Sequence, residues 1–235
     1  MDLKQTMAEL KKLADEQTLK TWKRHGATGE VYGVKIGNMK KLLKKIKGRQ
    51  DLALELYATG NLDAMYMAGL LADGGKMSKK ELKEWATAAR WQMIAEYTVP
   101  WVAAESPHGR ELALEWMDAK PVHLAAAGWN TYSGLVSIKP DDELDLKEVE
   151  KLLTRAEKNM ATSPDRVRYC MNGFVIAVGG AVKPLLPKAK AAAKRIGAVE
   201  VDMGDTACKV PPALGMIEKI EAMGRVGHKR KTCKC

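Results

Sequence analysis

The chain has 235 residues, of which 46% are hydrophobic, enough for one sizeable core or for an extended repeat array. No apolar run is long enough to span a membrane, and the N-terminus lacks the apolar core and cleavage site of a secretory signal, so we expect a cytoplasmic protein with no membrane partner. Four cysteines in a chain of this length do not indicate a disulfide framework.

The net charge of +10 is concentrated in two short blocks. Residues 35–49 carry +7 and residues 224–235 carry +5, neither block contains an acid, and the rest of the chain sums to −2. Clustered cations of this kind attract a polyanion, nucleic acid before any other. A solvated lysine face together with a flexible basic tail is the alternative explanation.

The cysteines do not predict a metal site. Cys233 and Cys235 form a C-x-C pair near His228, whereas Cys170 and Cys208 lie far upstream. Because a zinc site needs a second ligand pair at a suitable spacing, we expect no metal, and no other cofactor is indicated.

The N-terminal third predicts two helices separated by a glycine-containing loop. A helix is expected over residues 3–20, followed by a loop that leads into residues 31–34. Asn38 is expected to cap a short helix that ends at Gly48. Its inward positions repeat at helical spacing, so its lysines would form a positive ridge on the opposite face; the inward residues are Met39, Leu42, Leu43 and Ile46.

Further helices are predicted by their start signals. Residues 50–59 and 61–73 indicate a helical pair, and the capping box Ser78–Glu81 opens a helix near 79–89. Later starts are indicated at Ser106-Pro107, Pro121, Asp145, Ser163-Pro164, Pro187 and Pro211-Pro212. These patterns predict an all-α chain of roughly ten to twelve short helices stacked as hairpins, with one domain over residues 1–223 and a flexible basic tail over 224–235.

The segment from Trp91 to Trp101 is the most unusual of these helices. Its apolar residues recur at helical spacing, and Glu96 is the single acid within it. Pro100 cannot donate to the carbonyl of Glu96 and tends to kink the helix there. The sequence therefore places an acid and a freed carbonyl among aromatic rings, which is either a structural kink or a site.

Two stretches carry a resemblance to a known family. Tyr32-Gly33-Val34-Lys35, which leads into the basic helix, and Trp91 through Pro100, in which an acid and a proline follow a tryptophan, resemble motifs of the bacterial DNA alkylation repair proteins built from HEAT-like helical pairs. The tail from Gly224 to Cys233 is similar to that of uncharacterised members. The resemblance implies a HEAT-like α-α superhelix whose concave face holds duplex DNA.

The resemblance also implies site residues. Glu96 matches the position of the family's catalytic aspartate, and Trp91 matches one of its flanking tryptophans, while Trp129 and Phe174 are expected to face the damaged base with it. Gln92 replaces a second tryptophan, and an arginine of the family is missing at residues 125–127. DNA phosphates would be bound, independently of sequence, by Lys35, Lys40, Lys41, Lys44, Lys45, Arg90 and Arg166.

These residue types suit excision of N3- or N7-alkylated purines. A carboxylate stabilises the positive charge that develops on the sugar, and aromatic faces attract the cationic base by about 0.5–2 kcal/mol per contact. Glutamate in place of aspartate moves the carboxylate, and a displacement of about 1 Å can cost roughly a hundredfold in rate. Glu96 is equally explained as a partly exposed acid paired with Arg90 or a lysine, and the tryptophans as core residues. We therefore expect either a glycosylase or a non-enzymatic module that binds structured DNA or a protein, assumed to be a monomer.

Overall fold

The structure is a computed structural model in which residues 1–234 are described, and within them it is built from α-helices. The all-α prediction is confirmed. The α-helices are α1 (Leu3–Lys12), α2 (Glu16–Arg24), α3 (Ile36–Leu43), α4 (Gln50–Ala58), α5 (Leu62–Leu71), α6 (Lys79–Ala88), α7 (Val99–Ala104), α8 (Gly109–Met117), α9 (Val122–Ile138), α10 (Leu146–Asn159), α11 (Asp165–Ala181), α12 (Leu186–Ile196) and α13 (Ala213–Ala222). Four short helical turns join them, namely η1 (Gly74–Lys76), η2 (Ile94–Thr98), η3 (Asp141–Glu143) and η4 (Lys183–Leu185).

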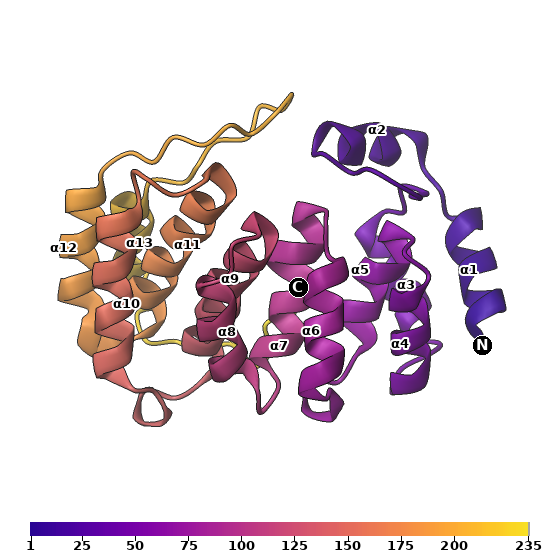
Figure 1. Ribbon diagram of the computed structural model, residues 1–235, viewed down its shortest axis with the longest axis horizontal. Helices are drawn as coiled ribbons and strands as arrows, with labels where there is room; N and C mark the ends of the chain where they lie inside the picture. Colours follow the sequence, from indigo (N-terminus) through magenta and orange to yellow (C-terminus); the bar gives the residue numbers. More distant parts are fainter. Residues whose placement is uncertain (235) are drawn as a thin grey trace.

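The helices form a row of hairpins in two layers. In Figure 1, α4, α6, α8 and α10 stand side by side in the nearer layer, with the second helix of each hairpin behind them. The long connection over residues 197–212 leaves α12 and extends back over the row towards α2 (Figure 1), and residues 205–208 line a small hollow together with the end of α2. The two ends of the row are therefore linked by this connection.

The second-layer helices provide most of the core. Apart from Asp63, α5 has no charged residue on any side, and every residue from Leu62 to Gly69 is buried. One core cluster occupies the N-terminal half and another the C-terminal half, and Trp101 packs against both. Close helix packing depends on Gly128 of α9, because a Cβ there would lie 2.5 Å from the backbone nitrogen of Met117.

Two expectations for the N-terminal helices are wrong. The helix expected over 3–20 is two helices, because the Asp15 side chain accepts the N–H of Thr18 at 2.8 Å and so begins α2. The basic helix begins at Ile36 rather than after Asn38, with Lys35 at the capping position and no side-chain cap. Met39 and Leu42 of this helix are buried and its lysines exposed, as the periodicity predicts.

Other predicted starts hold to within a residue or two. Ser78 and Glu81 form the predicted capping box of α6. α9, α11 and α13 each begin directly after a proline, as predicted at Pro121, Pro164 and Pro212. Ser106 does not cap α8, since its hydroxyl donates to the carbonyl of Ala103 at 2.7 Å and the helix begins at Gly109.

Residues 225–234, expected from the sequence to form a flexible basic tail, run across the ends of the second-layer helices in the structure. Gly227 donates its N–H to Gly180 at 2.9 Å, and Arg230 donates its N–H to Ser137 at 2.8 Å. The N–H of Cys233 reaches a carboxylate oxygen of Glu105 at 2.8 Å, and the Cys233 side chain is buried. Residue 235 lies outside the described residues.

The cations of the tail explain why it is held there. Lys229 Nζ donates to the carbonyl of Val136 at 2.8 Å in the last turn of α9, and Lys234 Nζ donates to the carbonyl of Ala72, which directly follows α5. Carbonyls at a helix C-terminus lack intrahelical donors and carry partial negative charge, which a cation stabilises. Part of the basic charge thus caps helices.

Glu105 is expected to control the attachment of the tail. Its carboxylate accepts from the Thr232 hydroxyl and the Cys233 N–H, and it lies 3.8 Å from Lys234 Nζ. Glu105→Ala should raise amide hydrogen exchange in residues 229–234 by at least about tenfold, the equivalent of roughly 1.4 kcal/mol of lost protection. Glu111→Ala, which removes an exposed acid on α8, is the matched control. Equal exchange in the two variants would contradict this role.

Candidate nucleic-acid interface

The segment with Glu96 is a π-helical turn, η2, followed without a break by α7. Within it the N–H of Val99 donates to the carbonyl of Ile94, five residues earlier. Pro100 leaves the carbonyl of Glu96 without a helical donor, as the sequence predicts. Asn130 of α9 supplies the missing bond, since its Nδ2 donates to that carbonyl at 2.7 Å. The irregular turn is therefore fixed by a neighbouring helix, and such π-turns often mark functional sites.

The carboxylate of Glu96 points into the molecule and is 2% exposed. Arg166 of α11, 70 positions later, forms a two-pronged pair with it: Arg166 Nε donates to Oε1 at 2.7 Å, and Nη2 donates to Oε2. The guanidinium also lies 4.6 Å from the centre of the Tyr169 ring. The Arg166 guanidinium is therefore paired with Glu96, and its expected contact with DNA phosphate stays a prediction.

Burial governs the protonation of this cluster. Burial raises the pKa of Glu96, and the paired guanidinium of Arg166 opposes that rise. The pKa values of the Cys170 thiol and the Tyr97 hydroxyl, which lie beside the pair, are raised for the same reason. A fixed arginine–carboxylate pair is satisfied in its ground state, so Glu96 has little remaining capacity to stabilise a new positive charge.

Solvent reaches the back of η2 through a small hollow of about 150 Å³. It is lined by Glu96, Tyr97 and Trp101 from the segment of η2 and α7, by Asn130 of α9 and by Arg230 of the tail. The tail residue Arg230 thus stands beside the segment that carries Glu96. Sequence reasoning gave no role to Asn130, and it placed Arg230 only within the basic block of the tail, because the contacts of both residues with this segment are distant in sequence.

The aromatic residues expected to face a damaged base are in the core. Trp129 and Phe174 are both fully buried, with ring centres 5.3 Å apart. Trp91 is 3% exposed and donates from Nε1 to the carbonyl of His25 at 2.9 Å, and so ties the end of α2 to η2. All three side chains pack in the core, which for the two tryptophans is the alternative that the sequence left open.

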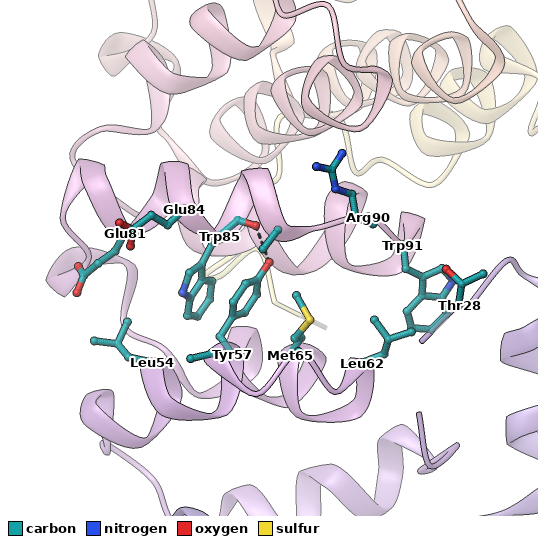
Figure 2. Close-up of a pocket in the computed structure, with 13 residues that line it drawn as sticks. Thr28, Leu54, Tyr57, Leu62, Met65, Glu81, Glu84, Trp85, Arg90 and Trp91 are labelled. Atoms are coloured by element: carbon teal, nitrogen blue, oxygen red, sulfur yellow. Dashed lines mark hydrogen bonds between the residues drawn. The ribbon is translucent and has the colours of Figure 1, made fainter. Parts of the chain in front are cut away.

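Arg90 and Trp91 border a larger cavity of about 560 Å³ between α4, α5 and α6. Figure 2 shows the Tyr57 and Trp85 rings face to face in its centre, and their centroids are 3.9 Å apart. The Arg90 guanidinium extends away from these rings in Figure 2, and no hydrogen bond or ion pair within residues 1–234 engages it. Arg90 is exposed and available to an anion, and its binding of DNA phosphate stays a prediction.

Four of the five predicted phosphate-binding lysines are exposed and unpaired among the described residues, namely Lys40, Lys41, Lys44 and Lys45. Lys35 is different because its Nζ lies 2.7 Å from Asp15, whose pKa it lowers to about 2. Lys40, Lys41, Lys44 and Lys45 therefore form a positive ridge, free of ion pairs among the described residues, on and just after α3; we call it the α3 ridge.

A buried acid that sequence reasoning missed holds the loop before this ridge. Asp63, in the first turn of α5, accepts the backbone N–H groups of Tyr32, Gly33 and Val34 at 2.5, 3.2 and 2.7 Å. Gly33 has φ +76°, and a Cβ there would lie 2.5 Å from the nitrogen of Leu19. The first motif that carries the family resemblance is thus a backbone nest around one carboxylate, which positions the α3 ridge.

In residues 1–234, no three His, Cys, Asp or Glu side chains are grouped so that they could hold a metal ion. No single helix there is long and apolar enough to cross a membrane. The segments Asp165–Ala181 and Lys183–Ile196 would be long and apolar enough only if taken together, and they are bent by 112° relative to each other.

The sequence matches the family described as DNA alkylation repair enzyme over residues 6–189, most of the chain. The chain belongs to the DNA alkylation repair enzyme family. The chain is also similar to two uncharacterised proteins, Lmo0209 of Listeria monocytogenes and Lin0241 of Listeria innocua. Each is 32% identical over 217 residues, which cover 90% of this chain and 93% of the relative.

A solved structure has the same fold as this DNA alkylation repair family member over the full length of both chains, with a TM-score of 0.92 and 36% identity. It is described as representing a new family of proteins related to the HEAT-like repeat DNA glycosylases with affinity for branched DNA structures. The HEAT-like helical fold that the sequence resemblance implies is therefore confirmed.

Proposed function

We propose that this protein binds branched DNA through its cationic surfaces and does not excise alkylated bases. The family assignment and the affinity of the similar structure for branched DNA support DNA as the ligand. The α3 ridge and Arg90 supply exposed cations that would hold phosphates.

The proposal that the protein does not excise alkylated bases rests on the ion pair between Glu96 and Arg166. Excision would need a carboxylate free to act on the sugar of a bound nucleotide. Glu96 is buried and held by two bonds from Arg166, and the expected base-facing rings Trp129 and Phe174 are covered by the core. Breaking a buried ion pair to free one partner costs several kcal/mol, which binding of a substrate would have to offset.

Two measurements on the same protein test the proposal. Fluorescence anisotropy with a labelled four-way junction and a linear duplex of equal length should show tighter binding of the junction. Alkylated DNA incubated with the protein should release N7-methylguanine and N3-methyladenine no faster than DNA alone. Release that exceeds this background and is lost in Glu96→Gln would establish the glycosylase instead, and absence of binding to either DNA would remove the DNA-binding proposal.

The α3 ridge is expected to supply much of the electrostatic affinity. Lys40→Glu, Lys41→Glu and Lys44→Glu together should weaken binding to the junction by roughly a hundredfold at physiological salt, and should flatten the dependence of log K on log salt by about one for each phosphate that is no longer neutralised. The control is Lys151→Glu, Lys158→Glu and Lys194→Glu, which reverses the same number of exposed charges on α10 and α12. Equal losses in the two variants would contradict a specific role of the ridge.

A further inference from the structure

The folded tail lines a second hollow that no part of the proposed function uses. This hollow of about 310 Å³ is formed by α9, α11, α13 and tail residues 225–230. It adjoins the small hollow behind Glu96, because Ser137 and Arg230 line both. Its volume lies at the lower end of the range of about 300–1,000 Å³ that is usual for small-ligand sites.

The rim of the hollow is cationic. Arg225, His228 and Arg230 line it, and no acid does. Within residues 1–234 no hydrogen bond or ion pair engages the side chains of Arg225 and His228, and the Arg230 guanidinium donates only to the carbonyl of Lys234, at 3.3 Å. The tail thus divides its basic residues into two groups. Lys229 and Lys234 fasten it to helix ends, whereas the two arginines and the imidazole have donors to spare for an anion.

Most of the other side chains that line the hollow are apolar. They include Ile176 and Ala177 of α11, Ile220 of α13, and Met223, which follows that helix; we call these four residues the floor. Met223 is 55% exposed, an unusual position for a large apolar side chain on the described surface. A cationic rim around an apolar floor fits a ligand that joins an anionic group to a flat, apolar body.

A nucleotide that has left the base stack has this chemistry. In a continuous duplex the bases are stacked inside, so only phosphates could reach the rim and the apolar floor would stay empty. At a branch point, unstacked nucleotides offer a phosphate together with an exposed base and sugar. Guanidinium groups bind the phosphate oxygens in pairs of hydrogen bonds.

We propose that this hollow binds one unstacked nucleotide of branched DNA, with its phosphate on Arg225, His228 and Arg230 and its base or sugar on the floor of Ile176, Ala177, Ile220 and Met223. The inference rests on the proposed function, since it names the part of the DNA that the tail recognises. It gives the preference for branches over duplex a physical origin.

The charge on the rim is tested with Arg225→Gln/Arg230→Gln. The matched control is Lys151→Gln/Lys194→Gln, which removes two exposed positive charges from helices α10 and α12. Junction affinity should fall by about tenfold or more in the rim variant, while duplex affinity falls by about twofold, so that the preference for the junction is lost. The control should keep the preference. Circular dichroism and urea unfolding should show that both variants fold like the wild type.

The floor is tested with Ala177→Leu, which fills the hollow without a change of charge. Junction affinity should fall while the salt dependence of binding stays unchanged. With 2-aminopurine at the branch point, the fluorescence change on binding by the wild type should be reduced in Ala177→Leu.

The outcomes separate this inference from the proposed function. A rim variant that binds the junction as tightly as the control, or one that loses junction and duplex affinity in equal proportion, would overturn the nucleotide site and leave DNA binding in place. A wild-type protein that binds neither DNA would overturn both.

Discussion

Replacing Arg166 by methionine is expected to destabilise the folded protein by about 3–5 kcal/mol at neutral pH, because Glu96 would be left as a buried charge without a partner. Urea unfolding followed by circular dichroism measures this loss.

The loss should also depend on pH. Burial raises the pKa of Glu96 above its ordinary value of 4.5, and removal of Arg166 removes the group that opposes this rise. Glu96 in the folded variant then binds a proton more readily than in the unfolded chain, so the contribution of Glu96 to stability is greatest at low pH and decreases as pH rises above about 4.5. The difference between wild type and Arg166→Met should therefore be smaller at pH 4 than at pH 7.

The matched control removes both charges at once. Glu96→Leu/Arg166→Met replaces the pair by apolar side chains and should recover most of the stability lost in Arg166→Met, since a buried pair is often no more stable than an apolar replacement. A double variant as unstable as the single one, or a single variant with wild-type stability, would show that the carboxylate is not confined as the structure indicates.

Asp63→Ala should lower the free energy of unfolding by about 3–5 kcal/mol, as much as Arg166→Met. The N–H groups of residues 32–34 would lose their acceptor, at a cost of roughly 1–3 kcal/mol for each one that stays buried. Asp63→Asn keeps one acceptor oxygen and should lie between Ala and the wild type. The measurement is urea unfolding at neutral pH.

Asp51→Ala is a suitable control, because it removes an exposed acid in the first turn of the neighbouring helix α4 and should change stability little. Asp63→Ala should also weaken junction binding, since the loop it holds positions the α3 ridge. Wild-type stability in Asp63→Ala would contradict the anchoring role of this carboxylate.

The sequence predicted those parts of the molecule that depend on neighbours along the chain. Proline positions and the capping box at Ser78 located most helix starts, and the freed carbonyl at Glu96 followed from Pro100 alone. The break between α1 and α2 was missed because the apolar period continues through Asp15, whose capping role depends on its bond to Thr18.

The site could not be derived in the same way, since its contacts join residues far apart in sequence. Arg166 was placed among phosphate-binding residues from its charge, yet its partner is Glu96, 70 positions earlier. Phe174 and Trp129 have the same residue types whether they face a groove or the core, and helical spacing does not distinguish the two. The tail was expected to be flexible because its partners are helix-end carbonyls, which leave no sign in the side-chain sequence.

The path of the tail has a consequence for the order in which the molecule is completed. The carbonyl that follows α5 receives its cation from a lysine 162 positions later, so during synthesis this contact cannot form until residue 234 has left the ribosome. Contacts of such long sequence separation form late, because the intervening chain must first be ordered. The helical hairpins would therefore fold first, and residues 225–234 would then bind across several of them in one late step.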